Sequence, residues 1–132
     1  MYTLLLVGIG GFLGSILRYT LSGWVQNNFV NFPVGTLVVN VSGSFLLGLI
    51  MYLSEYQGFF GGETRIFLTI GLIGGYTTLS TFSYESFRLL DDSKLTLMAI
   101  NLMATVLFSM FALYLGKIVA LNFGTYLLRG IR

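Results

Sequence analysis

The sequence predicts an all-α integral membrane protein built from four transmembrane helices. Of its 132 residues, 55% are hydrophobic and only 9% are charged, and the mean hydropathy is +0.85. Soluble proteins contain about 25% charged residues. Crossing the hydrocarbon layer takes about 20 mostly apolar residues, and four windows reach this length: 3–25, 34–53, 66–87 and 95–120. We expect helices rather than an open sheet, because backbone amides in lipid must bond within their own segment.

The connections between these windows are short and polar. They run from Gln26 to Pro33, from Glu55 to Arg65 and from Arg88 to Lys94, and each is too small to form a domain. We therefore predict a single four-helix transmembrane domain over residues 1–132, placed in the inner or plasma membrane of a prokaryote. The first apolar run is expected to be retained as a span, since it lacks the basic start and the clear cleavage site of a signal peptide.

The composition excludes several classes of site. The chain has no cysteine and no histidine, so thiolate metal sites and the commonest general base are absent. Its many hydroxyl groups lack a base that could activate them, and we predict no enzyme activity. A net charge of +2, scattered along the chain, does not indicate nucleic acid as a partner.

Basic residues are divided almost equally between the two sides of the membrane that four spans would define. With four spans, one side has Arg65, Lys117, Arg129 and Arg132, and the other has Arg18, Arg88 and Lys94. Lys and Arg normally gather on the cytoplasmic side, so this division sets the orientation only weakly. We infer that copies insert both ways up and meet as an antiparallel dual-topology dimer. A single orientation, biased by the C-terminal basic pair, is the alternative.

A pathway for an ion would need walls from a second subunit, because four helices packed together fill their own centre with side chains. Small residues that allow close helix contact are abundant. They include Gly10 and Gly14 in the first span, and Gly35, Ser42, Gly43, Ser44 and Gly48 in the second. Packing between helices of the same chain explains many of these glycines equally well.

The third span contains a polar interruption. The apolar residues 66–73 are followed by GGYTTLSTFS at residues 74–83. Two adjacent glycines weaken a helix, and hydroxyl groups can satisfy backbone groups that a break sets free. We predict a break near the bilayer midplane, where freed carbonyls could bind a hard cation such as Na⁺ and amides could face an anion. The alternative is a glycine kink buried against a neighbouring helix.

Polar side chains in two other spans could contribute to an anion pathway. Asn40 lies near the middle of the second span, where an amide facing lipid would be costly. Asn101, Thr105 and Ser109 recur every fourth residue, so they share one face of the last helix. Such groups could replace part of an anion's hydration shell without trapping it. Hydrogen bonding between helices is the structural alternative.

Charged side chains fall near the ends of the spans. Arg18 lies late in the first span, and Glu85 and Arg88 lie late in the third. Snorkelling toward the membrane surface is the default explanation, and Glu85 could also pair with either arginine. Phe82 is the aromatic residue we single out, because the partly positive edge of its ring could stabilise a dehydrated anion.

These motifs make the sequence resemble the small fluoride channels called Fluc, or CrcB, over nearly its whole length. The matching residues are Gly10-Gly11, Gly14 and Arg18-Tyr19, then Gly35-Thr36-Leu37, Asn40, Gly43 and Ser44, and finally the run from Gly74 to Glu85. The resemblance implies passive, fluoride-selective export from the cytoplasm through pores in an antiparallel dimer. It also implies a structural Na⁺ at the centre of that dimer.

The resemblance assigns roles to particular residues. The Na⁺ would be held by the backbone carbonyls of Gly74 and Thr77 from both subunits. The implied fluoride pathway takes residues from the second, third and fourth spans: Asn40, Leu79, Ser80, Thr81, Phe82, Asn101, Thr105 and Ser109.

Leu79 departs from the family pattern, which usually has phenylalanine at that position. Leucine keeps the apolar bulk but lacks the quadrupole of a ring, so conduction there could differ. The partner subunit would be a second copy of this chain in the opposite orientation, or a paralogue that supplies the phenylalanine. Arg18 and Glu85 remain candidates for a structural or charge role.

Two other functions stay open at this level. Small proton-coupled multidrug exporters are also four-span, dual-topology dimers of similar length. They resemble one another in having a glutamate within the first span, whereas this first span contains no acidic residue. A noncatalytic assembly subunit would use the same polar groups only for contacts between helices.

Overall fold

The computed structural model describes residues 1–130 of the chain, with side chains placed for residues 1–123. Every regular element in this range is helical. Four helical segments of the described chain are long and apolar enough to cross a membrane: Tyr2–Gln26, Val34–Gln57, Gly62–Asp91 and Leu95–Phe123. The predicted all-α fold with four spanning helices is confirmed. Arg132 and the side chain of Arg129, which entered the orientation argument, lie outside the described residues.

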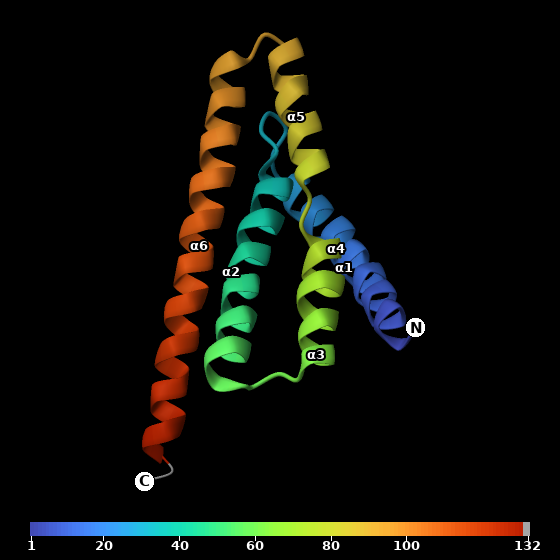
Figure 1. Cartoon of the computed structure of the whole chain (residues 1–132). Coiled ribbons are helices and arrows are strands. Elements are labelled where there is room, and N and C mark those ends of the chain that lie inside the picture. The colour runs from blue at the N-terminus through green and yellow to red at the C-terminus, as the bar shows by residue number, and fades with distance from the viewer. Residues whose placement is uncertain (131–132) are drawn as a thin grey trace.

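Three of the spans are single helices and one is composite. The single helices are α1 (Tyr2–Gln26), α2 (Val34–Gln57) and α6 (Leu95–Gly130). The third span consists of α3 (Gly62–Ile66), a π-helical stretch η1 (Phe67–Ile73), α4 (Gly74–Tyr76) and α5 (Leu79–Asp91). Figure 1 shows α2 lying along α6, while α3 and α4 lie beside α1 and α5 leans back toward the start of α6.

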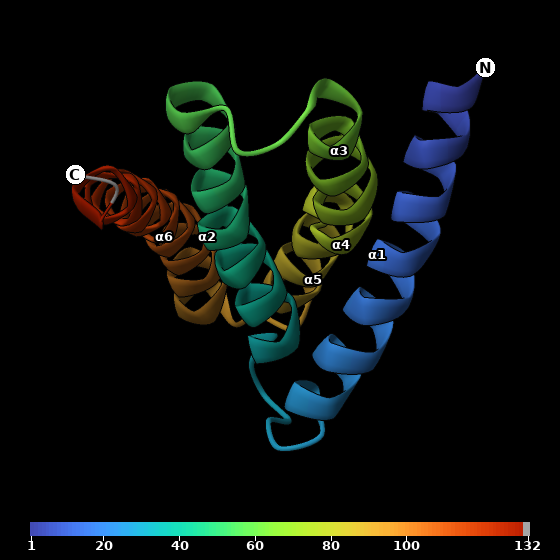
Figure 2. The ribbon, with the colours of Figure 1, turned by 90° about the horizontal axis from the view of Figure 1, so that it is seen from below.

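The four spans are arranged as a V when seen from below (Figure 2), with α6 and α2 in one arm, α1 in the other and the third span between them. In the described part of the chain, α1 and α6 make no contact with each other. One copy of the chain therefore does not close its outermost helices into a ring.

Glycines set the distance between helices of the same chain. A Cβ atom added at Gly10 would lie 2.8 Å from the backbone nitrogen of Leu72, and one at Gly48 would lie 3.1 Å from the carbonyl carbon of Leu113. Gly14 is enclosed in the same way. Backbone atoms cannot give way as a flexible side chain can, so these positions require glycine. Packing within one chain accounts for these glycines, and they do not indicate a dimer.

The turn between α1 and α2 is organised by one side-chain amide. The Gln26 amide nitrogen donates to the carbonyl oxygens of Phe29 and Phe32, and its oxygen accepts from the N–H of Gly35 at 3.0 Å. At the other end of α2, Gly58 has a φ of 61°, the left-handed conformation that ends many helices. Both ends of α2 are therefore defined by local backbone structure.

Candidate ion pathway

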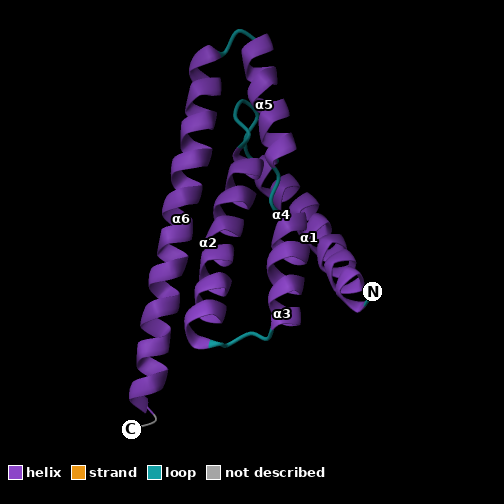
Figure 3. Ribbon diagram, viewed as in Figure 1, coloured by secondary structure: helices purple, strands orange, loops and turns teal. Residues whose placement is uncertain are grey.

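The third span is broken at Thr77 and Thr78, between α4 and α5 (Figure 3). Thr77 has φ −80° and ψ 157°, and Thr78 has φ −149° and ψ 118°, so both residues are extended. Helix α5 restarts at Leu79, and the Thr78 hydroxyl caps it by accepting from the N–H of Thr81 at 3.2 Å. The predicted interruption of the third helix is confirmed.

The glycine pair does not itself form the break. Gly74 and Gly75 are both helical, and the chain leaves the helix only after α4. A Cβ atom at Gly75 would lie 2.9 Å from the Cα of Gly11, so close contact with α1 is what requires glycine there. The threonines that follow provide the extended backbone and the helix cap, because a threonine hydroxyl can replace a missing backbone partner.

Asn40 links α2 to the broken segment through both ends of its side-chain amide. Its nitrogen donates to the carbonyl oxygen of Thr78 at 3.0 Å, and its oxygen accepts from the N–H of Thr78 at 2.8 Å. Both residues are buried, with 9% of Asn40 and 7% of Thr78 exposed. These bonds join the Asn40 amide to protein and satisfy backbone groups that lipid could not.

A cavity of about 300 Å³ lies beside the break. It is lined by Asn40, Gly43, Ser44, Leu47, Ile73, Thr77, Thr78, Leu79, Phe82, Thr105, Val106 and Ser109. None of these residues is acidic or basic, and an anion in the cavity would meet hydroxyl groups, an amide and an aromatic ring. Groups of this kind can replace water around an ion without binding it too tightly to leave.

The cavity brings together five of the eight predicted pathway residues: Asn40, Leu79, Phe82, Thr105 and Ser109. They come from α2, α5 and α6, which are distant in sequence. The Thr105 hydroxyl lies 3.5 Å from the side-chain oxygen of Asn101, whereas no side-chain hydrogen bond is described for Ser109. Two hydroxyl-bearing residues of α6, Thr105 and Ser109, therefore line the space beside the break.

The other three predicted residues lie elsewhere. Asn101 is only 1% exposed and donates to the hydroxyl of Ser86 at 3.0 Å, so it joins α6 to α5 outside the cavity. Thr81 lines a neighbouring cavity of about 260 Å³ together with Arg18. Ser80 is exposed at the start of α5. For Asn101, the geometry matches the helix-contact alternative.

Glu85 contacts a hydroxyl group rather than an arginine. The Thr36 hydroxyl donates to Oε1 of Glu85 at 2.8 Å, and Oε2 is buried without a described partner. In the part of the chain whose side chains are placed, the ion pair found joins Lys94 to Asp92, at 3.4 Å. The suggested pairing of Glu85 with Arg18 or Arg88 is therefore absent from this structure.

Sequence reasoning gave Thr36 and Thr78 no individual role, although both contact predicted site residues. Thr36 precedes Asn40 by four residues, so it shares a face of α2 with that residue. This spacing could have indicated that Thr36 points toward the third span. Nothing comparable marks Thr78, because the partner of an extended residue depends on which helix packs beside it.

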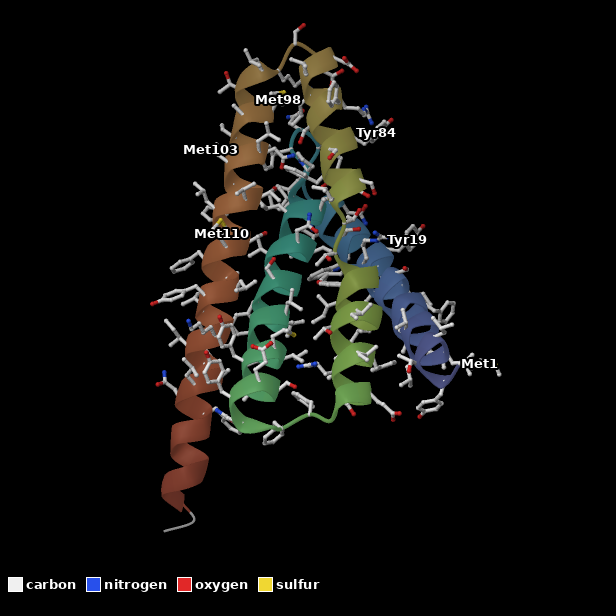
Figure 4. The ribbon with its side chains drawn as sticks, in the orientation of Figure 1. Met1, Tyr19, Tyr84, Met98, Met103 and Met110 are labelled. Carbon is white, nitrogen blue, oxygen red and sulfur yellow. The ribbon has the colours of Figure 1, made fainter. Side chains whose placement is uncertain are left out.

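The outer face of α5 carries exposed polar and aromatic residues. Leu79 is 75% exposed, and the hydroxyl-bearing Ser80, Thr81 and Ser83 are exposed beside it. Figure 4 shows the nearby Tyr84 pointing away from the bundle. A surface with several hydroxyl groups is unusual for a helix that faces lipid alone.

Backbone carbonyls are the cation ligands available at the break. No group of three or more His, Cys, Asp or Glu side chains gathers anywhere among the described residues. Within the described chain, the carbonyls of Gly74 and Thr77 accept no turn or loop hydrogen bond, and Gly74 is exposed. Free carbonyl oxygens at the end of a half-helix suit a hard cation, so these two residues fit Na⁺. The two carbonyl oxygens of one chain would leave other coordination positions of the ion for further ligands.

Comparison with known proteins agrees with this architecture. The chain matches the family described as CrcB-like protein, Camphor Resistance (CrcB), over residues 5–117. It is 73% identical to Fluoride-specific ion channel FluC 1 of Methanosarcina acetivorans and 70% identical to Fluoride-specific ion channel FluC 3 of Methanosarcina barkeri, in both cases over 132 residues that cover the whole of each chain. Fluoride-specific ion channel FluC of Geobacter metallireducens is 48% identical over 122 residues, which are 91% of this chain and 98% of that protein. With four spanning helices and these relatives, the chain belongs to the CrcB, or FluC, family of ion channels, which are not enzymes, and it is a multi-pass protein of the cell membrane.

Proposed function

We propose that this chain is a passive, fluoride-selective channel that lets fluoride leave the cytoplasm. The observation that carries the proposal is the cavity beside the break. Its hydroxyl groups, amide and ring come from α2, α5, α6 and the break itself, and its lining includes no acidic or basic side chain. The names of the relatives, fluoride-specific ion channels, support fluoride as the ion. Passive conduction accords with α1, which has no acidic residue that could couple transport to protons.

The conducting unit in this proposal is an antiparallel dimer of the chain. Support comes from the open V, in which α1 and α6 make no contact within the described residues, and from the near balance of basic residues between the two sides. Ser80, Thr81 and Ser83 are exposed, although their hydroxyl groups bond to Thr78 and to the carbonyl of Leu79 within the chain. The partner would cover this polar face, which is unusual for a helix facing lipid alone. Leu79 would then face the partner's pathway as well as its own cavity.

A structural Na⁺ at the centre of the dimer completes the proposal. The free carbonyls of Gly74 and Thr77 would hold it from each copy, so that two copies supply four oxygens. When bound, the ion would supply positive charge beside the anion pathway. This chain's own part is to keep those carbonyls unpaired at the end of α4.

Fluoride efflux from liposomes tests the function directly. Purified protein is reconstituted with fluoride inside, charge movement is balanced with a potassium ionophore, and external fluoride is followed with an ion-selective electrode. We expect rapid fluoride efflux and no chloride efflux from matched liposomes. Equal movement of both anions, or of neither, would contradict the proposal, and proton-dependent transport of a lipophilic cation would favour the exporter alternative.

Restoring an aromatic ring at residue 79 should increase conduction. Leu79→Phe would place the partly positive edge of a ring beside the cavity, and we take for its attraction to the anion the magnitude of an aromatic pair, about 0.5–1.5 kcal/mol. We expect fluoride flux in the liposome assay to rise by up to about tenfold. Leu107→Phe, at an exposed position of α6 outside the cavity, is the matched control and should leave flux unchanged. Unaltered or reduced flux in Leu79→Phe would mean that the ring has no role there.

A further inference from the structure

The backbone N–H of Thr78 donates to a side chain instead of to the backbone carbonyl expected in a helix. In an uninterrupted helix this N–H would donate to the carbonyl of Gly74, four residues earlier. The preceding residue does follow that pattern, because the N–H of Thr77 donates to the carbonyl of Ile73 at 2.9 Å. The N–H of Thr78 instead donates to the side-chain oxygen of Asn40 at 2.8 Å.

The second bond of the Asn40 amide holds this arrangement in place. The amide nitrogen donates to the carbonyl oxygen of the same residue, Thr78, at 3.0 Å. One planar side chain thus binds both backbone groups of a single extended residue, in a position where almost no surface is exposed. Close approach of α2 makes this possible, since a Cβ atom at Gly43, one turn after Asn40, would lie 3.1 Å from the Tyr76 ring.

We propose that Asn40 is a positioning residue for the cation site: by accepting the Thr78 N–H, it keeps the Gly74 carbonyl free to bind Na⁺. This inference rests on the proposed structural Na⁺. It gives Asn40 a second role beside lining the fluoride cavity, because the same amide would set the geometry of the cation site. Without the Asn40 oxygen, the Thr78 N–H would return to the Gly74 carbonyl or remain unpaired, and an unpaired buried donor is unfavourable.

A purely structural role for Asn40 predicts a different result. If the amide only joined α2 to the third span, its loss would lower stability equally with and without Na⁺. If the amide keeps a Na⁺ ligand free, its loss would weaken the response to Na⁺ itself. A ligand that binds the folded state stabilises it in proportion to the logarithm of its concentration, so thermal unfolding reports Na⁺ binding without any measurement of conduction.

The experiment compares thermal unfolding of wild type and Asn40→Leu in detergent. NaCl is exchanged for N-methylglucamine chloride at constant ionic strength. We expect the wild type to be stabilised by Na⁺ and Asn40→Leu to need at least a tenfold higher Na⁺ concentration for the same stabilisation. Gln57→Met is the matched control, because the Gln57 amide also donates to a backbone carbonyl of another helix, that of Ala120 at 2.8 Å. Its Na⁺ response should equal that of the wild type.

Two further variants keep the test decisive if Asn40→Leu does not fold. Asn40→Asp retains an acceptor for the Thr78 N–H, and its Na⁺ midpoint should be no higher than that of the wild type. Asn40→Ser is too short to keep both bonds, and its midpoint should rise at least tenfold. Equal midpoints in the wild type and in Asn40→Leu or Asn40→Ser would overturn the inference, as would a wild type that does not respond to Na⁺. Fluoride efflux measured on the same preparations separates the channel proposal from the inference about Asn40. A wild type that responds to Na⁺ but does not release fluoride would contradict only the channel proposal.

Discussion

A chain with both Thr105→Val and Ser109→Ala should conduct fluoride at least about a hundredfold more slowly than the wild type. Both changes remove a hydroxyl group from the cavity beside the break while nearly preserving side-chain size. A hydrogen bond to a charged group contributes about 1.5–3 kcal/mol. Losing two of them raises the barrier for a dehydrated anion by about 3 kcal/mol or more, which corresponds to about a hundredfold in rate. Fluoride efflux from liposomes provides the measurement.

The control for this pair removes two hydroxyl groups that lie outside the cavity. Thr20 bonds to the carbonyls of its own helix at 3.0 and 3.1 Å, and Thr69 bonds to the carbonyl of Arg65 at 2.8 Å. Thr20→Val with Thr69→Val should keep flux within about twofold of the wild type, since changes away from special features usually cost under about 0.5 kcal/mol. Equal loss of flux in the two double variants would show that the hydroxyl groups of Thr105 and Ser109 have no specific role in fluoride conduction.

Gly48→Leu should prevent α2 from packing against α6 and reduce the yield of folded protein severely. A Cβ atom at this position would lie 3.1 Å from the carbonyl carbon and 3.2 Å from the Cα of Leu113. These are backbone atoms, so the two helices would have to separate along their contact. Overpacking costs about 1–3 kcal/mol where side chains can adjust, and we expect about 3 kcal/mol or more here. Thermal unfolding in detergent and the monodisperse fraction after purification provide the measurement.

Gly8→Leu serves as the matched control, because, apart from the neighbouring residues and backbone of its own helix, no described atom lies within 4 Å of a Cβ atom added there. Both changes replace a helical glycine with leucine, which should favour the helix slightly by itself. We expect Gly8→Leu to unfold at or above the temperature of the wild type. A stable, monodisperse Gly48→Leu protein would mean that α2 and α6 can separate without loss of the fold.

Part of the site could be predicted from residue pattern alone. The repeat of Asn101, Thr105 and Ser109 placed three polar groups on one face of a helix, because the helical period is fixed. The pattern could not separate Asn101, buried against Ser86 on α5, from Thr105 and Ser109, which line the cavity. That difference depends on where α5 crosses α6, and the crossing is set by contacts between residues distant in sequence.

The sequence by itself determined four membrane spans and a break in the third, because span length and backbone hydrogen bonding in lipid leave few alternatives. Tertiary structure alone decided where that break lies and what holds it open. Gly74 and Gly75 stay helical, with Gly75 packed against α1, and the extended residue Thr78 is held by Asn40 from α2. Tertiary structure also decided that Glu85 bonds to Thr36 rather than to an arginine. The reason is physical: a buried polar group must find a partner, and which partner lies within 3 Å depends on how whole helices pack.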